Sequence, residues 1–97
     1  MDIKKINRLL DPKRLLPPGS RVLKIEAQNY VDSLGEDSLR IDVLLDDSIT
    51  DDEIAQNRLR PIDDAITGAL RKAGVQLFPY IFWARESELA EEEEEFS

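Results

Sequence analysis

Apolar and polar residues alternate strictly in two stretches of the first half of the chain, residues 21–30 and residues 39–45. A period of two with β-branched residues is typical of strands that bury one face. The link between them, residues 32–38, is polar and contains a glycine, so it suits a hairpin loop. We therefore predict an antiparallel hairpin, in a register that sets Lys24 against Asp42 on the polar face.

A helical period follows the hairpin, over residues 50–73. Thr50 and Glu53 have the spacing of a capping box, which specifies a helix start, and Gly74 supplies a left-handed stop. Pro61 lacks an amide donor and clashes with the preceding turn. We therefore expect one main helix with a kink or break just before this proline.

Residues 77–85 are apolar on both faces and predict a third strand. Pro79 cannot donate to a ladder, so this strand should start there or lie at an edge of the sheet. Tyr80 and Phe82 would project from one face and Trp83 from the other. One helix layer covers only one face, so the second needs the N-terminal segment, another subunit or a partner.

The chain begins with a short amphipathic helix, residues 2–10, which ends at Asp11-Pro12. Residues 15–19 are then expected to form an extended connector and turn. The predicted fold is a small α+β domain of order (α)ββαβ, a three-stranded sheet with one main kinked helix packed across it. We divide the chain into a basic N-terminal helix and connector (1–19), a single ββαβ domain (20–89) and an acidic disordered tail (90–97).

Composition narrows the chemistry that this chain can perform. Its 97 residues include no cysteine and no histidine, and the formal charge is -8. These counts exclude disulfides, thiolate metal sites, Cys or His nucleophiles and imidazole acid–base catalysis. No apolar run has the length of a transmembrane helix or signal peptide. We therefore expect a soluble cytoplasmic protein that is not an enzyme, with no catalytic residue and no cofactor.

The charge is unevenly distributed along the sequence. The first 21 residues hold six basic side chains and two acidic ones, whereas residues 91–95 are five consecutive glutamates. A basic run can contact nucleic acid, although the acidic remainder favours protein partners. The element order resembles that of KH-like ribosome-associated factors, which implies an RNA- or ribosome-associated factor as the alternative function. Its nucleic-acid contacts would be Lys4, Lys5, Arg8, Lys13 and Arg14.

Acidic residues also gather where the second strand ends and the main helix begins. Asp46, Asp47 and Asp51 are the candidate ligands for a divalent cation, because Mg²⁺ and Ca²⁺ prefer carboxylate oxygens. Aspartates are also favoured at turns and at the start of a helix, where they cap the backbone amides. This explanation accounts for the acidic residues without a metal. We predict no metal site.

Gly19-Ser20 and Asp42 resemble motifs of the minimal nucleotidyltransferases, which use a Gly-Ser turn and an Asp-x-Asp pair to hold metal and triphosphate. Arg40 stands where the pair requires its other aspartate. The resemblance implies a further alternative, a metal-dependent phosphoryl-transfer enzyme that would use Asp42 with Asp46 and Asp47.

The aromatic strand carries the main functional prediction. Aromatic side chains dominate the energetics of protein interfaces, and an edge strand offers backbone groups for pairing. We expect a non-catalytic accessory or adaptor protein that forms a homodimer or binds a protein partner through the face or edge of this strand. The expected anchors are Tyr80, Phe82 and Trp83. The biological process and the identity of the partner do not follow from the sequence.

Overall fold

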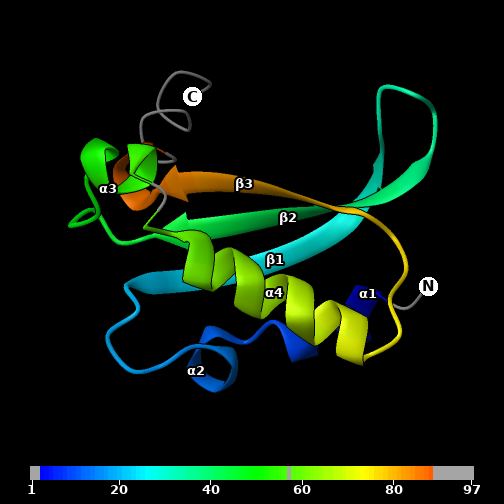
Figure 1. The fold of residues 1–97 in the computed structure, drawn as a ribbon, viewed down its shortest axis with the longest axis horizontal. Coiled ribbons are helices and arrows are strands. Elements are labelled where there is room, and N and C mark those ends of the chain that lie inside the picture. Colours follow the sequence, from blue (N-terminus) through cyan, green and yellow to red (C-terminus); the bar gives the residue numbers. More distant parts are fainter. Residues whose placement is uncertain (1–2, 57, 89–97) are drawn as a thin grey trace, which may run out of the picture.

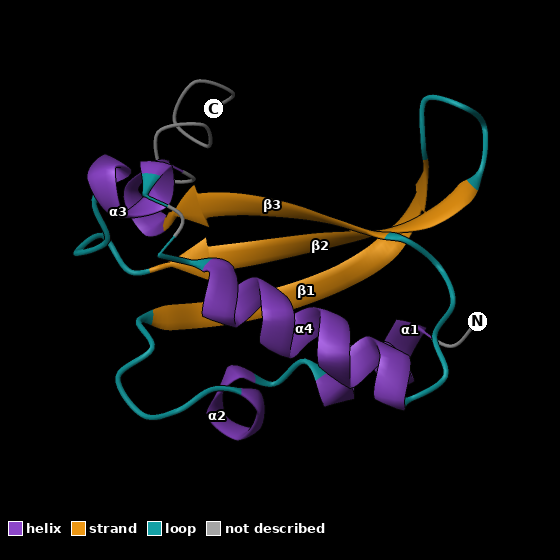
Figure 2. Ribbon diagram, viewed as in Figure 1, coloured by secondary structure: helices purple, strands orange, loops and turns teal. Residues whose placement is uncertain are grey.

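The computed structural model describes residues 3–56 and 58–88, which fold into a three-stranded sheet with helices packed on one face (Figures 1 and 2). Strand order is β1-β2-β3, with β1 antiparallel and β3 parallel to β2. This confirms the predicted small α+β fold, with a mixed sheet. The strands are β1 (Val22–Val31), β2 (Asp37–Leu45) and β3 (Pro79–Arg85).

The predicted register of the hairpin was wrong by two residues. Asp42 lies opposite Glu26, and Lys24 lies opposite Leu44. The opposite charges pair along each strand rather than across the hairpin, since Lys24 Nζ lies 3.2 Å from a carboxylate oxygen of Glu26. The hairpin loop sets the register instead, because the Asp32 carboxylate accepts the amides of Leu34 and Glu36 at 2.9 Å each.

The main helix is broken near Pro61, as predicted, into α3 (Asp51–Ala55) and α4 (Arg60–Lys72). The proline occupies the first turn of α4, where its missing amide costs no helical hydrogen bond. The capping box is confirmed, because Thr50 Oγ1 accepts the Glu53 amide and the Glu53 carboxylate accepts the Thr50 amide. Helix α4 buries three residues against the sheet: Ile62, Ile66 and Leu70.

The N-terminal segment forms two short helices, α1 (Ile3–Leu9) and α2 (Pro12–Leu15). Helix α2 was not predicted: Asp11 accepts the Lys13 amide as an N-cap, and the proline that ends the first helix starts the second. Ile6, Leu10 and Leu16 are buried in the same core as α4, on the same face of the sheet. The segment therefore belongs to the core. The predicted disordered tail, residues 90–97, lies outside the described residues.

The N-cap of helix α3 allows a direct test of its contribution to stability. We expect Thr50→Ala to lower the free energy of unfolding by about 1 kcal/mol, because the Glu53 amide loses its acceptor. Urea denaturation followed by circular dichroism measures this loss, with Ser33→Ala in the exposed hairpin loop as the matched control. Equal midpoints for the two variants would show that the cap does not contribute.

Glu53 also joins the capping box to the start of β1. Its carboxylate pairs with the guanidinium of Arg21, with the closest contact at 2.7 Å. Arg21 holds a positive φ of 62°, a conformation that non-glycine residues rarely adopt. The hydrogen bond from Arg21, followed by the one from the Thr50 amide, lowers the pKa of Glu53 from 4.5 to about 2.

This lowered pKa predicts how stability depends on pH. The pKa of Glu53 is lower in the folded state than in the unfolded state, so the carboxylate stabilises the fold fully above pH 4.5. That contribution is lost as the pH falls through about 2. The melting temperature of the wild type should exceed that of Glu53→Gln at neutral pH, and the difference should shrink towards pH 2. A difference that stays constant over this range would contradict the assigned pKa.

Candidate interaction surface

The sheet has one covered face and one open face. Helices α1, α2 and α4 pack on the covered face, and no element of residues 3–56 or 58–88 lies across the other (Figure 2). None of the described helices is long and apolar enough to span a membrane. We call the uncovered side the open face; its principal residues are Lys24, Glu26, Gln28, Tyr30, Arg40, Asp42, Leu44, Tyr80, Phe82 and Ala84.

Four aromatic rings form a continuous band on the open face near the hairpin loop: Tyr30, Phe78, Tyr80 and Phe82. The ring centroid of Tyr80 lies 5.5 Å from Tyr30 and 4.8 Å from Phe78, and Phe82 lies 6.4 Å from Tyr30. Tyr30 comes from β1 and Tyr80 from β3, so their rings meet across β2. Ser38, the β2 residue opposite Tyr30, is only 3% exposed, and its small side chain leaves room for this contact. Phe78 and Phe82 remain 64% and 39% exposed.

Arg40 connects the band to the polar part of the open face. Its guanidinium carbon lies 4.3 Å from the centre of the Phe82 ring, a cation–π geometry. The same guanidinium pairs with Asp42 at 3.0 Å, and Gln28 donates to that carboxylate at 2.7 Å. One face of the Phe82 ring therefore contacts a guanidinium whose charge is balanced by Asp42.

Tyr80 ties the third strand to the hairpin loop. Its hydroxyl donates to the Asp32 carboxylate at 3.2 Å. Burial, together with this hydrogen bond, raises the pKa of Tyr80. The amide of Glu36, aided by the amide of Leu34 and the Tyr80 hydroxyl, lowers the pKa of Asp32. The loop and the aromatic band thus form one hydrogen-bonded unit.

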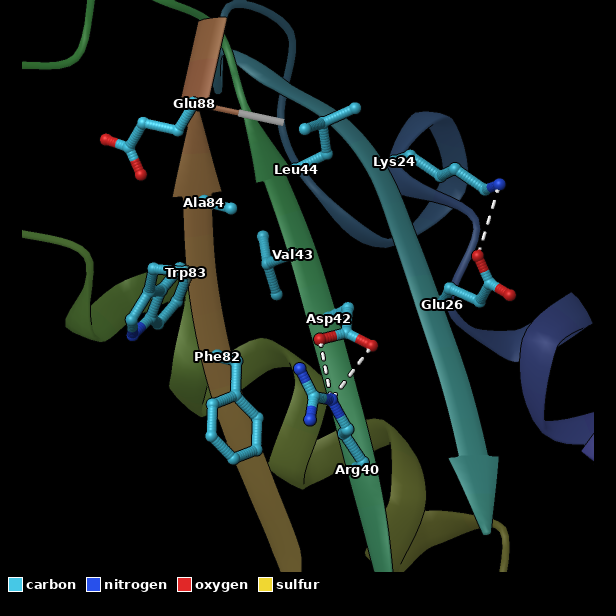
Figure 3. Close-up of a pocket in the computed structure, with 10 residues that line it drawn as sticks. All are labelled: Lys24, Glu26, Arg40, Asp42, Val43, Leu44, Phe82, Trp83, Ala84 and Glu88. Carbon is cyan, nitrogen blue, oxygen red and sulfur yellow. Dashed lines mark hydrogen bonds and ion pairs between the residues drawn. The ribbon is translucent and has the colours of Figure 1, made fainter. Parts of the chain in front are cut away.

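A shallow groove of about 560 Å³ continues the open face away from the hairpin (Figure 3). Its apolar lining includes Leu44, Phe82 and Ala84. The ion pairs of the two neighbouring strands flank it: Lys24 with Glu26, and Arg40 with Asp42. In Figure 3 the Trp83 ring points away from these charges.

The two edges of the sheet differ in their accessibility. At the β1 edge, the side-chain amide of Asn7 acts like a strand: its oxygen accepts the Ala27 amide at 2.7 Å, and its nitrogen donates to the Ala27 carbonyl at 3.1 Å. At β3, the Leu39 amide donates to the Phe78 carbonyl. Since parallel ladders alternate, the backbone groups of Ile81 and Trp83 point away from β2, towards the free edge.

The structure separates the three expected anchors. Tyr80 and Phe82 lie in the aromatic band, whereas Trp83 is half-buried against the core. Sequence reasoning missed Tyr30 and Phe78 as members of the band. Tyr30 stands at a polar-face position of its strand, and an aromatic residue in that position was the signal available.

The acidic candidates are each engaged in a separate local contact. Asp46 accepts the Ser48 amide at 2.9 Å, Asp47 accepts the Ser87 amide at 3.0 Å, and Asp51 pairs with Arg85. Within the part of the chain that the structure describes, no three metal-ligating side chains form a group that could hold an ion. Asp42, the residue of the nucleotidyltransferase resemblance, lies on the open face instead of joining Asp46 and Asp47.

The basic candidates lie on the N-terminal helices, and all five are exposed: Lys4, Lys5, Arg8, Lys13 and Arg14. Three of them line one groove, together with a fourth basic residue that was not among the candidates predicted from the sequence. Lys4 and Arg8 of α1, Arg14 of α2 and Lys24 of β1 line this groove at the β1 edge.

Comparison with known proteins yields no match: no family model, curated protein or solved structure is similar to this chain. The function is therefore argued from the geometry of the surface itself.

Proposed function

We propose that this protein is a small non-catalytic accessory protein of the cytoplasm. It binds a second copy of itself or a protein partner through the open face and the adjoining free edge of β3. The observation that carries the proposal is the aromatic band on an uncovered sheet face, with Phe78 and Phe82 exposed. Monomeric proteins seldom leave such contiguous apolar surface in water.

The residues around the aromatic band are typical of a protein–protein interface. Phe82 is flanked by Arg40, and aromatic residues with arginine are the side chains most enriched at interface centres. The aromatic side chains lose little rotamer freedom on binding, because ring contacts already restrict them. The balanced ion pairs around the groove would form a polar rim.

The free edge of β3 supplies a second, directional element. A strand added there would hydrogen-bond to the outward backbone groups of Ile81 and Trp83, and Pro79 limits such pairing to the residues after it. The β1 edge is unsuitable because Asn7 occupies the backbone groups of Ala27. Pairing at one edge only would give a closed two-fold dimer or a complex with one bound strand.

Sedimentation equilibrium over a concentration series tests the proposal that the protein binds a second copy of itself. We expect Phe82→Ala to weaken association about tenfold or more, which is the effect of an anchor worth at least 1.4 kcal/mol. Leu34→Ala is the matched control, because Leu34 is an exposed apolar residue at the hairpin tip, outside the band. Circular dichroism checks that both variants keep the fold.

Selection from a displayed library of random peptides tests the partner arm. Selected peptides should bind the wild type and Leu34→Ala alike and lose binding to Phe82→Ala. If neither the self-association nor any selected peptide depends on Phe82, the proposed function is wrong.

A further inference from the structure

We propose that the occupant of the free β3 edge is a second copy of this chain, whose β3 pairs antiparallel with the first about a two-fold axis at Phe82. This inference rests on the proposed function, because it uses the same edge, and it goes further by naming the partner and the register. The two sheets would then form one continuous sheet with both open faces on the same side.

Strand β3 has no charged side chain before its last residue, yet none of its residues is buried. Ile81 and Trp83 pack against the core but remain partly exposed. Their partners on β2, Ile41 and Val43, are only 0% and 1% exposed. Edge strands are usually protected by charged side chains, a bulge or a covering element. A further strand beside β3 would supply the cover that Ile81 and Trp83 lack.

The charges at the two ends of β3 favour a second copy in antiparallel orientation. At the start of the strand, the exposed Arg71 of α4 lines a groove with Phe78 and Pro79. Acidic side chains gather at the other end, around Arg85: Asp47, Asp51, Glu86 and Glu88. Antiparallel pairing sets the acidic end of each strand beside the basic end of the other. The contact is therefore complementary even though each copy carries a net charge of -8.

The bounds of the strand select the register. Because outward backbone groups alternate along β3, the two-fold axis must pass through a residue. Phe82 is the central residue of Pro79–Arg85, so an axis there uses the whole strand. Ile81 of each copy then exchanges both backbone hydrogen bonds with Trp83 of the other. The missing amide of Pro79 falls at the end of the ladder, opposite Arg85.

The neighbouring registers are worse for identifiable reasons. Moving the axis one residue towards Pro79 sets this proline, which has no amide, opposite Trp83, and a hydrogen bond is lost in each half. Moving the axis the other way sets Tyr80 opposite Glu86, which lies beyond the strand in a helical turn. The register about Phe82 avoids both losses.

The same register joins the aromatic bands of the two copies. Phe82 lies opposite Phe82 of the second copy, and Tyr80 lies opposite Ala84. Facing residues that exchange no hydrogen bonds come closest in an antiparallel pair, with about 4.5 Å between their Cα atoms. The large Tyr80 side chain therefore meets a small one, and the two Phe82 rings continue the band across the new contact.

Amide hydrogen exchange of the wild-type chain, measured residue by residue at rising protein concentration, tests the pairing. The amides of Ile81 and Trp83 face solvent in a single copy, whereas the Phe82 amide points towards β2. We expect exchange at Ile81 and Trp83 to slow about tenfold once roughly nine-tenths of the chains are paired, with little change at Phe82.

An isotope-filtered nuclear Overhauser experiment tests the register in an equal mixture of labelled and unlabelled wild-type chains. It should show a contact between the Hα of Tyr80 in one copy and the Hα of Ala84 in the other. These residues are about 13 Å apart along a single strand, so the contact cannot arise within one chain.

Charge reversal tests the orientation. Arg71→Glu and Glu86→Lys should each weaken association about three- to tenfold in roughly 50 mM salt, and the chain that carries both should associate like the wild type. Lys13→Glu on α2 is the matched control, because it changes the charge equally at an exposed position on another element. Circular dichroism checks that every variant keeps the fold.

Three results would overturn the inference. Association that depends on Phe82 but leaves exchange at Ile81 and Trp83 unchanged would mean that the open faces stack, so the proposed function would stand without edge pairing. A chain that stays monomeric, while a selected peptide slows exchange at these two amides, would assign the edge to a different protein. Charge variants that weaken association without rescuing each other would contradict the antiparallel orientation.

Discussion

Replacing Leu10 with alanine should lower the free energy of unfolding by about 2–5 kcal/mol. Leu10 is completely buried and packs in the core with Ile6 and Leu16, although α1 is too short to be stable alone. The lost contacts leave a cavity between the N-terminal segment, β1 and α4. Because small domains are stable by about 5–15 kcal/mol, this one substitution removes a large part of the total.

The adjacent residue provides the control for that experiment. Leu9 is 41% exposed, so Leu9→Ala should cost less than about 1 kcal/mol. Urea denaturation of both variants by circular dichroism measures the difference. Similar small losses at Leu9 and Leu10 would mean that the N-terminal segment is not part of the core.

Asn7→Leu should also destabilise the protein, by about 1–3 kcal/mol, and should change its association. The Ala27 amide and carbonyl lose both partners, and leucine offers no replacement donor or acceptor. The outer edge of β1 then becomes available for strand pairing. We expect the variant to self-associate more than the wild type at equal concentration.

Adding Phe82→Ala to Asn7→Leu identifies which edge of the sheet causes the self-association. Association gained by Asn7→Leu should persist when Phe82→Ala is added, since it uses β1 rather than the aromatic band. Asn29→Leu, at an exposed position on the same strand, is the control and should produce neither effect. A gain that Phe82→Ala abolishes would show that Asn7 does not protect the β1 edge.

Local signals in the sequence were sufficient where one or two residues dictate the backbone. Thr50 and Glu53 specify the start of α3 through their reciprocal hydrogen bonds, and Pro61 forces the break before α4. Pro79 was expected to begin a strand or lie on an edge strand, and it does both. These features depend on residues that are close in sequence, so they can be predicted from local sequence patterns.

Features that depend on distant residues were not predictable in the same way. The hairpin register follows from the hydrogen bonds of Asp32 in the loop, not from charges on the strands. Pro12 was interpreted only as the end of one helix, whereas with Asp11 it also starts the next. The pairing of Asn7 with Ala27 links positions 20 apart, and no local pattern records it.

The same limit applies to the candidate site. The alternation along β3 correctly separated Tyr80 and Phe82 from Trp83. The aromatic band itself is assembled across three strands, because Ser38 is small enough for Tyr30 and Tyr80 to meet above it. Which residues belong to the band therefore depends on the strand order and on the register of the hairpin. The strand order was not predicted from the sequence, and the predicted register was wrong.

The most direct test of the central claim is a map of amide chemical shifts as association proceeds, either with rising protein concentration or on addition of a selected peptide. The account predicts that the largest changes fall on Tyr30, Phe82 and the outward amides of Ile81 and Trp83. The exposed surface of α4, including Asp64 and Arg71, should stay unchanged. Changes centred on the helices, or no change in either titration, would contradict the proposal that the open face is the binding surface.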